Sequence, residues 1–211
     1  MQKPKSFMNT QEYLQYEECS ITRHEFVNGQ IFAMTGGTNR HNIIVLNLAT
    51  ILRQQVRGTN CRTYVADQKL RIEATNSFYY PDVLVACEAF DHNTTFSERA
   101  ILIVEVLSKS TSSIDRREKV IAYRQIPTLM EYLIVFQNHQ RVQLHRRDEN
   151  DQWVLLEFCT GEEFELLSSN SCSLRISMEQ IYEEVDWKQK DSKFVREDEA
   201  IWSFIDPDFD W

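Results

Sequence analysis

The sequence predicts an α/β fold with a central mixed β-sheet flanked by helices. Two short runs rich in Val, Ile and Leu, at 83–87 and 101–107, are typical of strands buried on both faces. Segments 38–57 and 115–126 carry apolar residues at helical spacing. From residue 131 onward, short apolar runs alternate with turn residues, which predicts an antiparallel meander at one edge of the sheet.

Length and composition favour one globular domain followed by a tail. The chain has 211 residues, of which 42% are hydrophobic and 26% charged, and this length can bury a layered core. We expect one domain at 1–185. Residues 186–211 mix acidic with aromatic side chains, which is too charged for a core element and too aromatic for an inert linker.

Local patterns in the first third of the chain predict a helix, a hairpin and a long helix. Asn9 and Glu12 form a capping-box pattern. The dipeptide Asn28-Gly29 separates strands expected at 23–27 and 30–34, because this pair favours two-residue hairpin turns. The helix at 38–57 should be the longest, and Gly58 is a suitable residue to end it.

The remaining elements follow in order. CRTYVAD and KLRIE predict one strand or a pair of strands, since they are rich in β-branched and aromatic residues. After the strand at 101–107, Asp115 and Glu118 suggest another capping box, and Pro127 ends the helix. EYLIVFQ, RVQLHRR, WVLLEFC and EFELL are the strands of the meander, and Ser177 caps a final helix through Val185.

Cysteine usage, hydropathy and charge limit the function classes. No signal-like segment and no uninterrupted apolar stretch of about 18 residues occurs, so we expect a cytoplasmic protein without membrane contact. The net charge of −9 argues against broad phosphate neutralisation. The cysteines are odd in number and scattered, which predicts reduced, mostly buried thiols and no zinc site; they are Cys19, Cys61, Cys87, Cys159 and Cys172.

Two acidic residues lie in or beside strongly apolar strands and need an explanation. Asp82 stands at the entry of one run, and Glu105 is embedded in another. A buried ionised carboxylate is costly unless it is paired, hydrogen-bonded or bound to metal. The nearest cation in sequence is Lys119, one turn into the following helix. Spacing alone is equally consistent with a structural ion pair and with a catalytic site.

An ordered set of motifs resembles the PD-(D/E)XK nuclease superfamily, and within it the Uma family of bacterial restriction endonuclease-like proteins. The resemblance covers roughly residues 10–185 and includes the hairpin sequence EFVNG. The ordered set is far more specific than any single motif. Its members are Tyr80-Pro81-Asp82, Val104-Glu105-Val106-Leu107-Ser108, Asp115 to Lys119, Tyr123 and Glu131-Tyr132.

The resemblance implies a restriction endonuclease-like core and a metal-dependent endonuclease that hydrolyses DNA. Asp82 and Glu105 would bind Mg²⁺ or Mn²⁺, and a Lys would help position and activate the attacking water. The chain departs from the usual pattern because Leu107 stands where that Lys is expected, two residues after the Glu. In the Uma-like pattern a Lys of the following helix takes over, so the role passes to Lys119.

Further residues are candidates for the site, each with a simpler alternative. Glu25 could add a third carboxylate or be a hairpin surface residue, and His41 could face the cleft or lie on the helix surface. Ser108 could contact phosphate or belong to a polar loop. The most basic stretch of the chain could bind substrate phosphate although the whole molecule is acidic; its candidates are Lys109, Arg116 and Arg117.

Two other functions are compatible with these observations. A nuclease-like fold with weak or lost catalysis could serve as a nucleic-acid or protein interaction module, which the acidic net charge favours. Alternatively, the tail at 186–211 could mediate self-association, with a homodimer as the expected oligomer, or mimic nucleic acid toward a basic partner.

Overall fold

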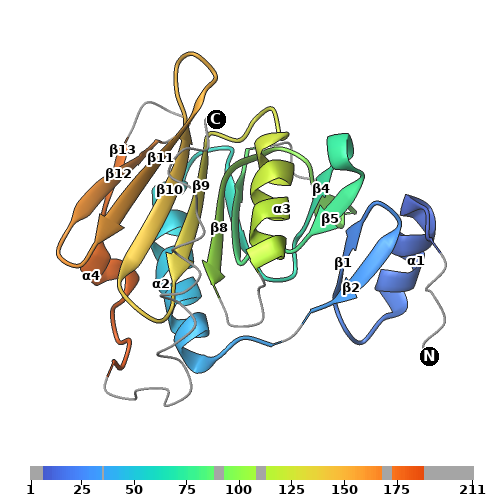
Figure 1. Cartoon of the computed structure of the whole chain (residues 1–211), viewed down its shortest axis with the longest axis horizontal. Helices are drawn as coiled ribbons and strands as arrows, with labels where there is room; N and C mark the ends of the chain where they lie inside the picture. The colour runs from blue at the N-terminus through green and yellow to red at the C-terminus, as the bar shows by residue number, and fades with distance from the viewer. Residues whose placement is uncertain (1–6, 35, 88–92, 108–112, 168–172, 188–211) are drawn as a thin grey trace.

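A six-stranded mixed sheet forms the centre of the computed structural model, which describes residues 7–34, 36–87, 93–107, 113–167 and 173–187 (Figure 1). Its strand order is β11-β10-β9-β8-β6-β3, with β8 and β9 parallel and all other neighbours antiparallel. The strands are β3 (Arg62–Val65), β6 (Val83–Ala86), β8 (Ala100–Leu107), β9 (Glu131–Phe136), β10 (Arg141–Arg147) and β11 (Trp153–Cys159). The predicted α/β fold with a central mixed sheet is confirmed.

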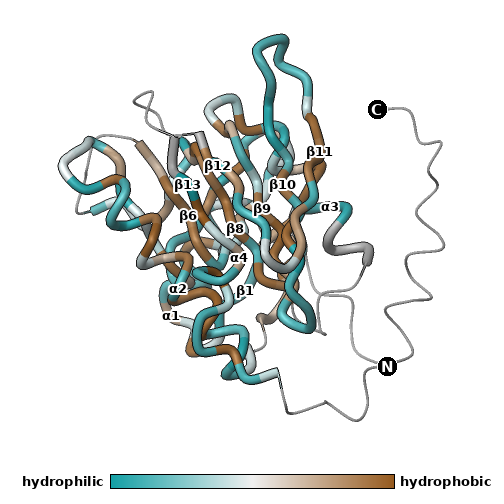
Figure 2. Tube along the Cα trace, turned by 90° about the vertical axis from the view of Figure 1, so that its left-hand side faces the viewer, coloured by the Kyte–Doolittle hydropathy of each residue, from teal (hydrophilic) through white to brown (hydrophobic). Residues whose placement is uncertain are grey.

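Helices cover both faces of this sheet. Helix α2 (Asn39–Gln55) packs on one face, and α3 (Ser113–Arg124) lies on the other. Side chains alternate along a strand, so β8 sends Val104 toward α2 and Ile103 toward α3. Hydrophobic residues therefore run almost without interruption along β6 and β8 (Figure 2).

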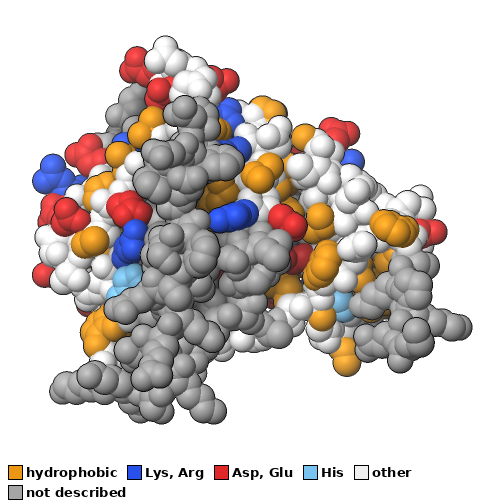
Figure 3. Space-filling view, in the orientation of Figure 1, with side chains coloured by type: hydrophobic (Ala, Val, Ile, Leu, Met, Phe, Trp, Pro, Cys, Tyr) orange, Lys and Arg blue, Asp and Glu red, His pale blue; other side chains and the backbone are white. Residues whose placement is uncertain are grey.

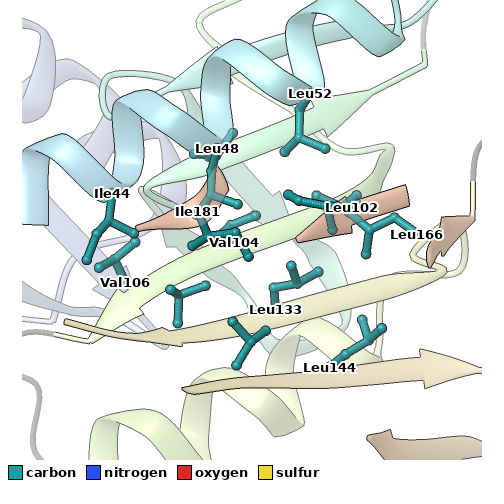
Figure 4. Packing of buried hydrophobic residues seen from close by; sticks show 14 of the residues in the cluster. Ile44, Leu48, Leu52, Leu102, Val104, Val106, Leu133, Leu144, Leu166 and Ile181 are labelled. Carbon is teal, nitrogen blue, oxygen red and sulfur yellow. The ribbon is translucent and has the colours of Figure 1, made fainter. Parts of the chain in front are cut away.

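The larger core cluster lies between α2 and the sheet. Ile44 and Leu48 of α2 are fully buried and point toward Val104 and Val106 of β8 (Figure 4). Each such side chain contributes about 1.5–3 kcal/mol through burial. This packing fixes α2 across the strand that carries Glu105.

A second, five-stranded sheet lies beside the first with the order β2-β1-β5-β4-β7, and α1 (Thr10–Cys19) packs against its hairpin. The turn residues Asn28 and Gly29 both have positive φ, at 44° and 93°, as a two-residue hairpin turn requires. The capping box of Asn9 and Glu12 is present. The strands are β1 (His24–Val27), β2 (Gln30–Ala33), β4 (Lys69–Ile72), β5 (Ser77–Tyr79) and β7 (Phe96–Ser97).

Several predicted elements differ from the structure. Strands β3 and β4 belong to different sheets, and EFELL leaves the meander, because β12 (Glu163–Leu167) pairs with β13 (Ser173–Ser177) in a separate two-stranded sheet. The helix α3 begins at Ser113 and ends at Arg124. The last helix, α4 (Met178–Ile181), ends before Val185, since Glu184 adopts a left-handed φ of 60° that no helix can continue through.

The prediction of reduced thiols is wrong for two of the five cysteines, and the prediction of burial is wrong for two others. Cys61 and Cys87 form a disulfide. Arg62 is paired with Ala86 in the antiparallel β3–β6 register, so Cys61, just before Arg62, lies opposite Cys87, just after Ala86. Cys19 and Cys159 are free but exposed. Cys172 lies outside the described residues. Within the described ranges, no helix has the length and apolar character needed to cross a membrane.

Trp187 is the one aromatic residue of the predicted tail that the structure describes. Its ring lies 5.5 Å from that of Tyr182 and 5.4 Å below the guanidinium carbon of Arg40. This part of the tail packs on the body of the protein, against the N-terminal end of α2. Residues 188–211 lie outside the described residues.

Candidate functional site

Asp82 and Glu105 face each other at one end of the β6–β8 pair. Val83 is opposite Val104, so one further step along this antiparallel register sets Asp82 opposite Glu105. Both side chains belong to the α3 face of the sheet, because they alternate with residues that face α2. The Asp82 Oδ2 atom accepts a hydrogen bond of 2.7 Å from the backbone N–H of Val106.

Lys119 and Glu25 are the third and fourth side chains at this position. The Lys119 Nζ atom lies 3.2 Å from Glu105 Oε1 and 2.7 Å from Glu25 Oε1. Only 11% of the Lys119 side chain and 12% of the Glu105 side chain are exposed, so these charges are largely removed from water. The ammonium group also lies 5.6 Å from the centre of the Tyr79 ring, which favours a cation.

Tyr123 belongs to the motifs that carry the family resemblance, but no role at the site was predicted for it from the sequence. Its hydroxyl donates a hydrogen bond of 2.6 Å to Glu105 Oε1. Tyr123 lies one helical turn beyond Lys119 on α3, and this four-residue spacing puts both side chains on one helix face. That spacing, together with the motif that contains Tyr123, was the available signal.

The charge balance of the cluster changes how Glu105 ionises. Burial is the largest cause and raises the pKa of Glu105, the Lys119 ammonium opposes it, and the carboxylates of Asp82 and Glu25 raise it further. The resulting pKa is about 7. Two carboxylates, those of Glu105 and Glu25, share the one ammonium group of Lys119, and Asp82 adds a third carboxylate nearby.

Lys119 itself remains protonated. Burial lowers its pKa, but the carboxylates of Glu105 and Glu25 outweigh burial and hold the pKa above its ordinary value. A lysine in this state can stabilise negative charge but cannot accept a proton from water at neutral pH. The ion pairs with Glu25 and Glu105 hold the ammonium group between β1 and β8.

His41 lies in the first turn of α2 and contacts Asp82. Its Nε2 atom is 3.2 Å from Asp82 Oδ2, and its Nδ1 atom is buried without a hydrogen-bond partner among the described residues. A Cβ atom on Gly37 would lie 2.7 Å from Nδ1, so glycine leaves room for the ring. Burial lowers the pKa of His41, but the hydrogen bond and charge of Asp82 raise it above its ordinary value.

The structure thus brings together Asp82, Glu105, Lys119, Glu25 and His41. The view in Figure 3 has acidic side chains on the surface between α3 and the β1–β2 hairpin, with hydrophobic ones around them. Of the predicted phosphate ligands, Arg117 lies exposed on α3. Ser108 and Lys109 lie outside the described residues, as does the side chain of Arg116.

The donor set fits a hard divalent cation held by few protein ligands. Within the described ranges, no three His, Cys, Asp or Glu side chains converge in a way that would enclose a metal ion. Mg²⁺ commonly keeps several waters and uses one or two carboxylates, which Asp82 and Glu105 can supply. Glu25 is paired with Lys119 instead. The three carboxylates of Asp82, Glu105 and Glu25 around one ammonium group favour an added cation here.

A comparison with models of known protein families identifies the family of this chain. A family model described as "Uma2: Putative restriction endonuclease" matches residues 10–179. The chain belongs to the Uma2 family. This match spans every strand of the six-stranded sheet and all the site residues described above. The resemblance drawn from the sequence motifs is confirmed.

Two relatives of this Uma2 protein come from Synechocystis sp. The uncharacterized protein slr1290 is 34% identical over 176 residues, covering 83% of this chain and 91% of the relative. The uncharacterized protein sll1609 is 35% identical over 158 residues, covering 74% of this chain and 89% of the relative.

A solved structure supports the fold. The crystal structure of a putative nuclease belonging to DUF820 from Anabaena variabilis superposes with a TM-score of 0.69. It covers 83% of this chain and 97% of that chain, at 15% sequence identity. At this identity the comparison establishes the shared fold alone, which in the Uma2 chain is a mixed β-sheet flanked by helices.

Proposed function

We propose that this protein is an endonuclease that hydrolyses DNA phosphodiester bonds with a bound Mg²⁺ or Mn²⁺ ion. The observation that carries the proposal is the buried cluster in which Lys119 lies 3.2 Å from Glu105 and 2.7 Å from Glu25, beside Asp82. Membership of a family described as restriction endonucleases supports the same reaction.

Each side chain has a role in this proposal. Asp82 and Glu105 would hold the metal ion, which when bound supplies polarisation of the scissile phosphate and an acidified water. Protonated Lys119 stabilises the negative charge that develops as water attacks phosphorus and the P–O bond breaks. Tyr123 holds Glu105 through its hydroxyl hydrogen bond, and His41 holds Asp82.

Substrate phosphate would meet the basic residues around the α3 N-terminus. Arg117 is exposed on that helix, Arg116 directly precedes it, and Lys109 lies a few residues before the helix begins at Ser113. Such a local patch can attract phosphate although the net charge of the chain is −9. Ser108 directly follows β8 and would add a hydroxyl contact to phosphate.

DNA cleavage by purified variants tests this proposal. Wild type should nick supercoiled plasmid or cut single-stranded DNA in Mg²⁺ or Mn²⁺, and Lys119→Met should be slower by about 100-fold or more, as for loss of one preorganised charge-stabilising group. Arg53→Met, at an exposed position of α2, is the matched control and should cut normally. Equal nicking by wild type and Lys119→Met would contradict the mechanism.

Metal binding provides a separate measurement. Calorimetric titration with Mn²⁺ should detect binding to wild type and none to Asp82→Asn. A protein that binds Mn²⁺ and DNA but cuts neither plasmid nor single strands would instead support the interaction-module alternative, which the net charge of −9 favours. Wild type without Mn²⁺ or Mg²⁺ binding would overturn the proposed metal role of Asp82 and Glu105.

A further inference from the structure

Glu17 on α1 is a buried carboxylate that lies outside the site described above. Its side chain is completely buried. The Oε1 atom accepts hydrogen bonds of 2.8 Å from the Tyr80 hydroxyl and 2.9 Å from the backbone N–H of His24. The Oε2 atom lies 3.1 Å from His24 Nδ1.

The partners of Glu17 belong to the two segments that deliver acidic residues to the site. His24 immediately precedes Glu25 on β1, and Tyr80 stands two residues before Asp82. Pro81, between Tyr80 and Asp82, has a restricted φ angle. The backbone at Pro81 therefore cannot readily compensate for a displacement of Tyr80, and Asp82 moves with it. Glu17 thus holds one end of each segment.

Helix packing alone does not account for a carboxylate at this position. The helix α1 is already fixed by the apolar cluster of Tyr13, Phe26 and Phe78, where the Tyr13 and Phe26 rings lie 4.9 Å apart. The Tyr13 hydroxyl also donates to the His24 carbonyl at 2.7 Å. An apolar side chain would fill the place of Glu17 without the desolvation penalty of a charged group. What the carboxylate adds is simultaneous bonding to the two segments.

We infer that Glu17 is a positioning residue of the Asp82–Glu105–Lys119 site, acting through Tyr80 and His24. It holds the Asp82 segment in register with Glu105 and holds the Glu25 segment against Lys119. The inference deepens the proposed function and rests on it for its catalytic meaning. The geometric claim concerns the position of Asp82 and can be measured without metal or substrate.

Hydrogen exchange at the Val106 amide reports the position of Asp82, because this N–H donates to Asp82 Oδ2 at 2.7 Å. In Tyr80→Phe and in Glu17→Gln, this amide should exchange about fivefold faster or more than in wild type. The amide of Leu133 on the neighbouring strand β9 serves as the internal reference for global opening.

The matched control is Tyr182→Phe. Tyr182 is also buried, and the one proton of its hydroxyl is shared between the carbonyls of Phe136 and Arg141, each at 2.8 Å. This variant should lose comparable thermal stability while the Val106 exchange rate, relative to that of Leu133, stays at the wild-type value. If Glu17→Gln fails to fold, Tyr80→Phe alone decides, since it removes a single hydroxyl.

Unchanged Val106 exchange in Tyr80→Phe, relative to Leu133, would overturn the inference. Selective acceleration in Tyr80→Phe and not in Tyr182→Phe would support it. Calorimetry with Mn²⁺ then distinguishes the role of Glu17 from the proposed metal site. The affinity for Mn²⁺ should fall about tenfold or more in Tyr80→Phe, as for other residues that orient metal ligands. Wild type that binds no Mn²⁺ would overturn the metal site while the exchange result still decides the role of Glu17.

Discussion

Strands β8 and β9 run parallel side by side, and each carries a buried glutamate with a different environment. Glu131 begins β9, is fully buried, and lies directly opposite Arg146 of β10. The Arg146 guanidinium donates to Glu131 Oε1 at 2.8 Å and also donates to the Glu165 carbonyl. This carboxylate has a cation of its own, placed by the register of two strands.

Glu105, near the end of β8, shares its cation with Glu25. Its partner Lys119 lies closer to Glu25, at 2.7 Å, than to Glu105, at 3.2 Å. Asp82 adds a further negative charge nearby, and the pKa of Glu105 rises to about 7, through burial first of all. The two glutamates show that burial of a carboxylate does not by itself indicate function. The balance of charge around it distinguishes a structural pair from a site that favours an added cation.

Removing the arginine of the structural pair should have the largest effect on stability. Arg146→Ala would remove the arginine that pairs with the fully buried Glu131, and breaking a buried ion pair costs about 3–5 kcal/mol in the free energy of unfolding. Urea unfolding at pH 7 measures the loss. Arg175→Ala is the control, because this exposed arginine lies 3.6 Å from Glu165 and should contribute less than about 1 kcal/mol. A loss below 1 kcal/mol in Arg146→Ala would contradict the comparison.

Removing the charge of Glu105, the glutamate of the candidate site, should increase the stability of the folded protein. The pKa of Glu105 is raised from 4.5 to about 7 on folding, so the folded state binds more protons between these pH values, and stability falls as pH rises through this window. Glu105→Gln should therefore unfold with a free energy higher by up to about 3 kcal/mol at pH 8, and by much less at pH 4.5.

Denaturant unfolding at several pH values tests this prediction, with Glu131→Gln as the matched control. The control loses a paired buried charge and should be less stable than wild type at pH 8. Stability should rise in Glu105→Gln while DNA cleavage is lost. This result would show that the charge of Glu105 serves the proposed reaction and not folding. Destabilisation by Glu105→Gln at pH 8 would remove the distinction between the two glutamates.

Local sequence patterns were sufficient for the elements that position the site. The apolar runs at 83–87 and 101–107 became β6 and β8, and the cost of burying charge pointed to Asp82 and Glu105. Lys119 followed from its place one turn into the next helix, and its Nζ atom does lie 3.2 Å from Glu105. These inferences succeed because strand burial and helix phase are local properties.

Features that depend on distant pairing were not predictable in the same way. The disulfide between Cys61 and Cys87 follows from the β3–β6 register, which a spacing of 26 residues does not reveal. The separation of β12 from the meander depends on its pairing with β13. The contact between His41 and Asp82 depends on how α2 docks at the end of the sheet, where helix periodicity gives no information.

The smallest effect expected here comes from the hydroxyl of Tyr123, and it sharpens the comparison by isolating one interaction of Glu105. This hydroxyl donates to Glu105 Oε1 at 2.6 Å and lowers the pKa of Glu105 by favouring the ionised carboxylate. Tyr123→Phe should therefore raise that pKa above about 7 and cost about 1–2 kcal/mol at pH 8.

At pH 5 the loss in Tyr123→Phe should be smaller, because Glu105 is then protonated in the folded state and needs the hydroxyl donor less. Thermal unfolding across pH 5 to 8 measures the difference. Tyr182→Phe is again the control, since its hydroxyl bonds to backbone carbonyls that do not titrate, and its loss should be the same at both pH values. An equal loss in Tyr123→Phe at pH 5 and pH 8 would mean that Glu105 does not titrate in this range, and that it resembles Glu131 more closely than the surrounding charges indicate.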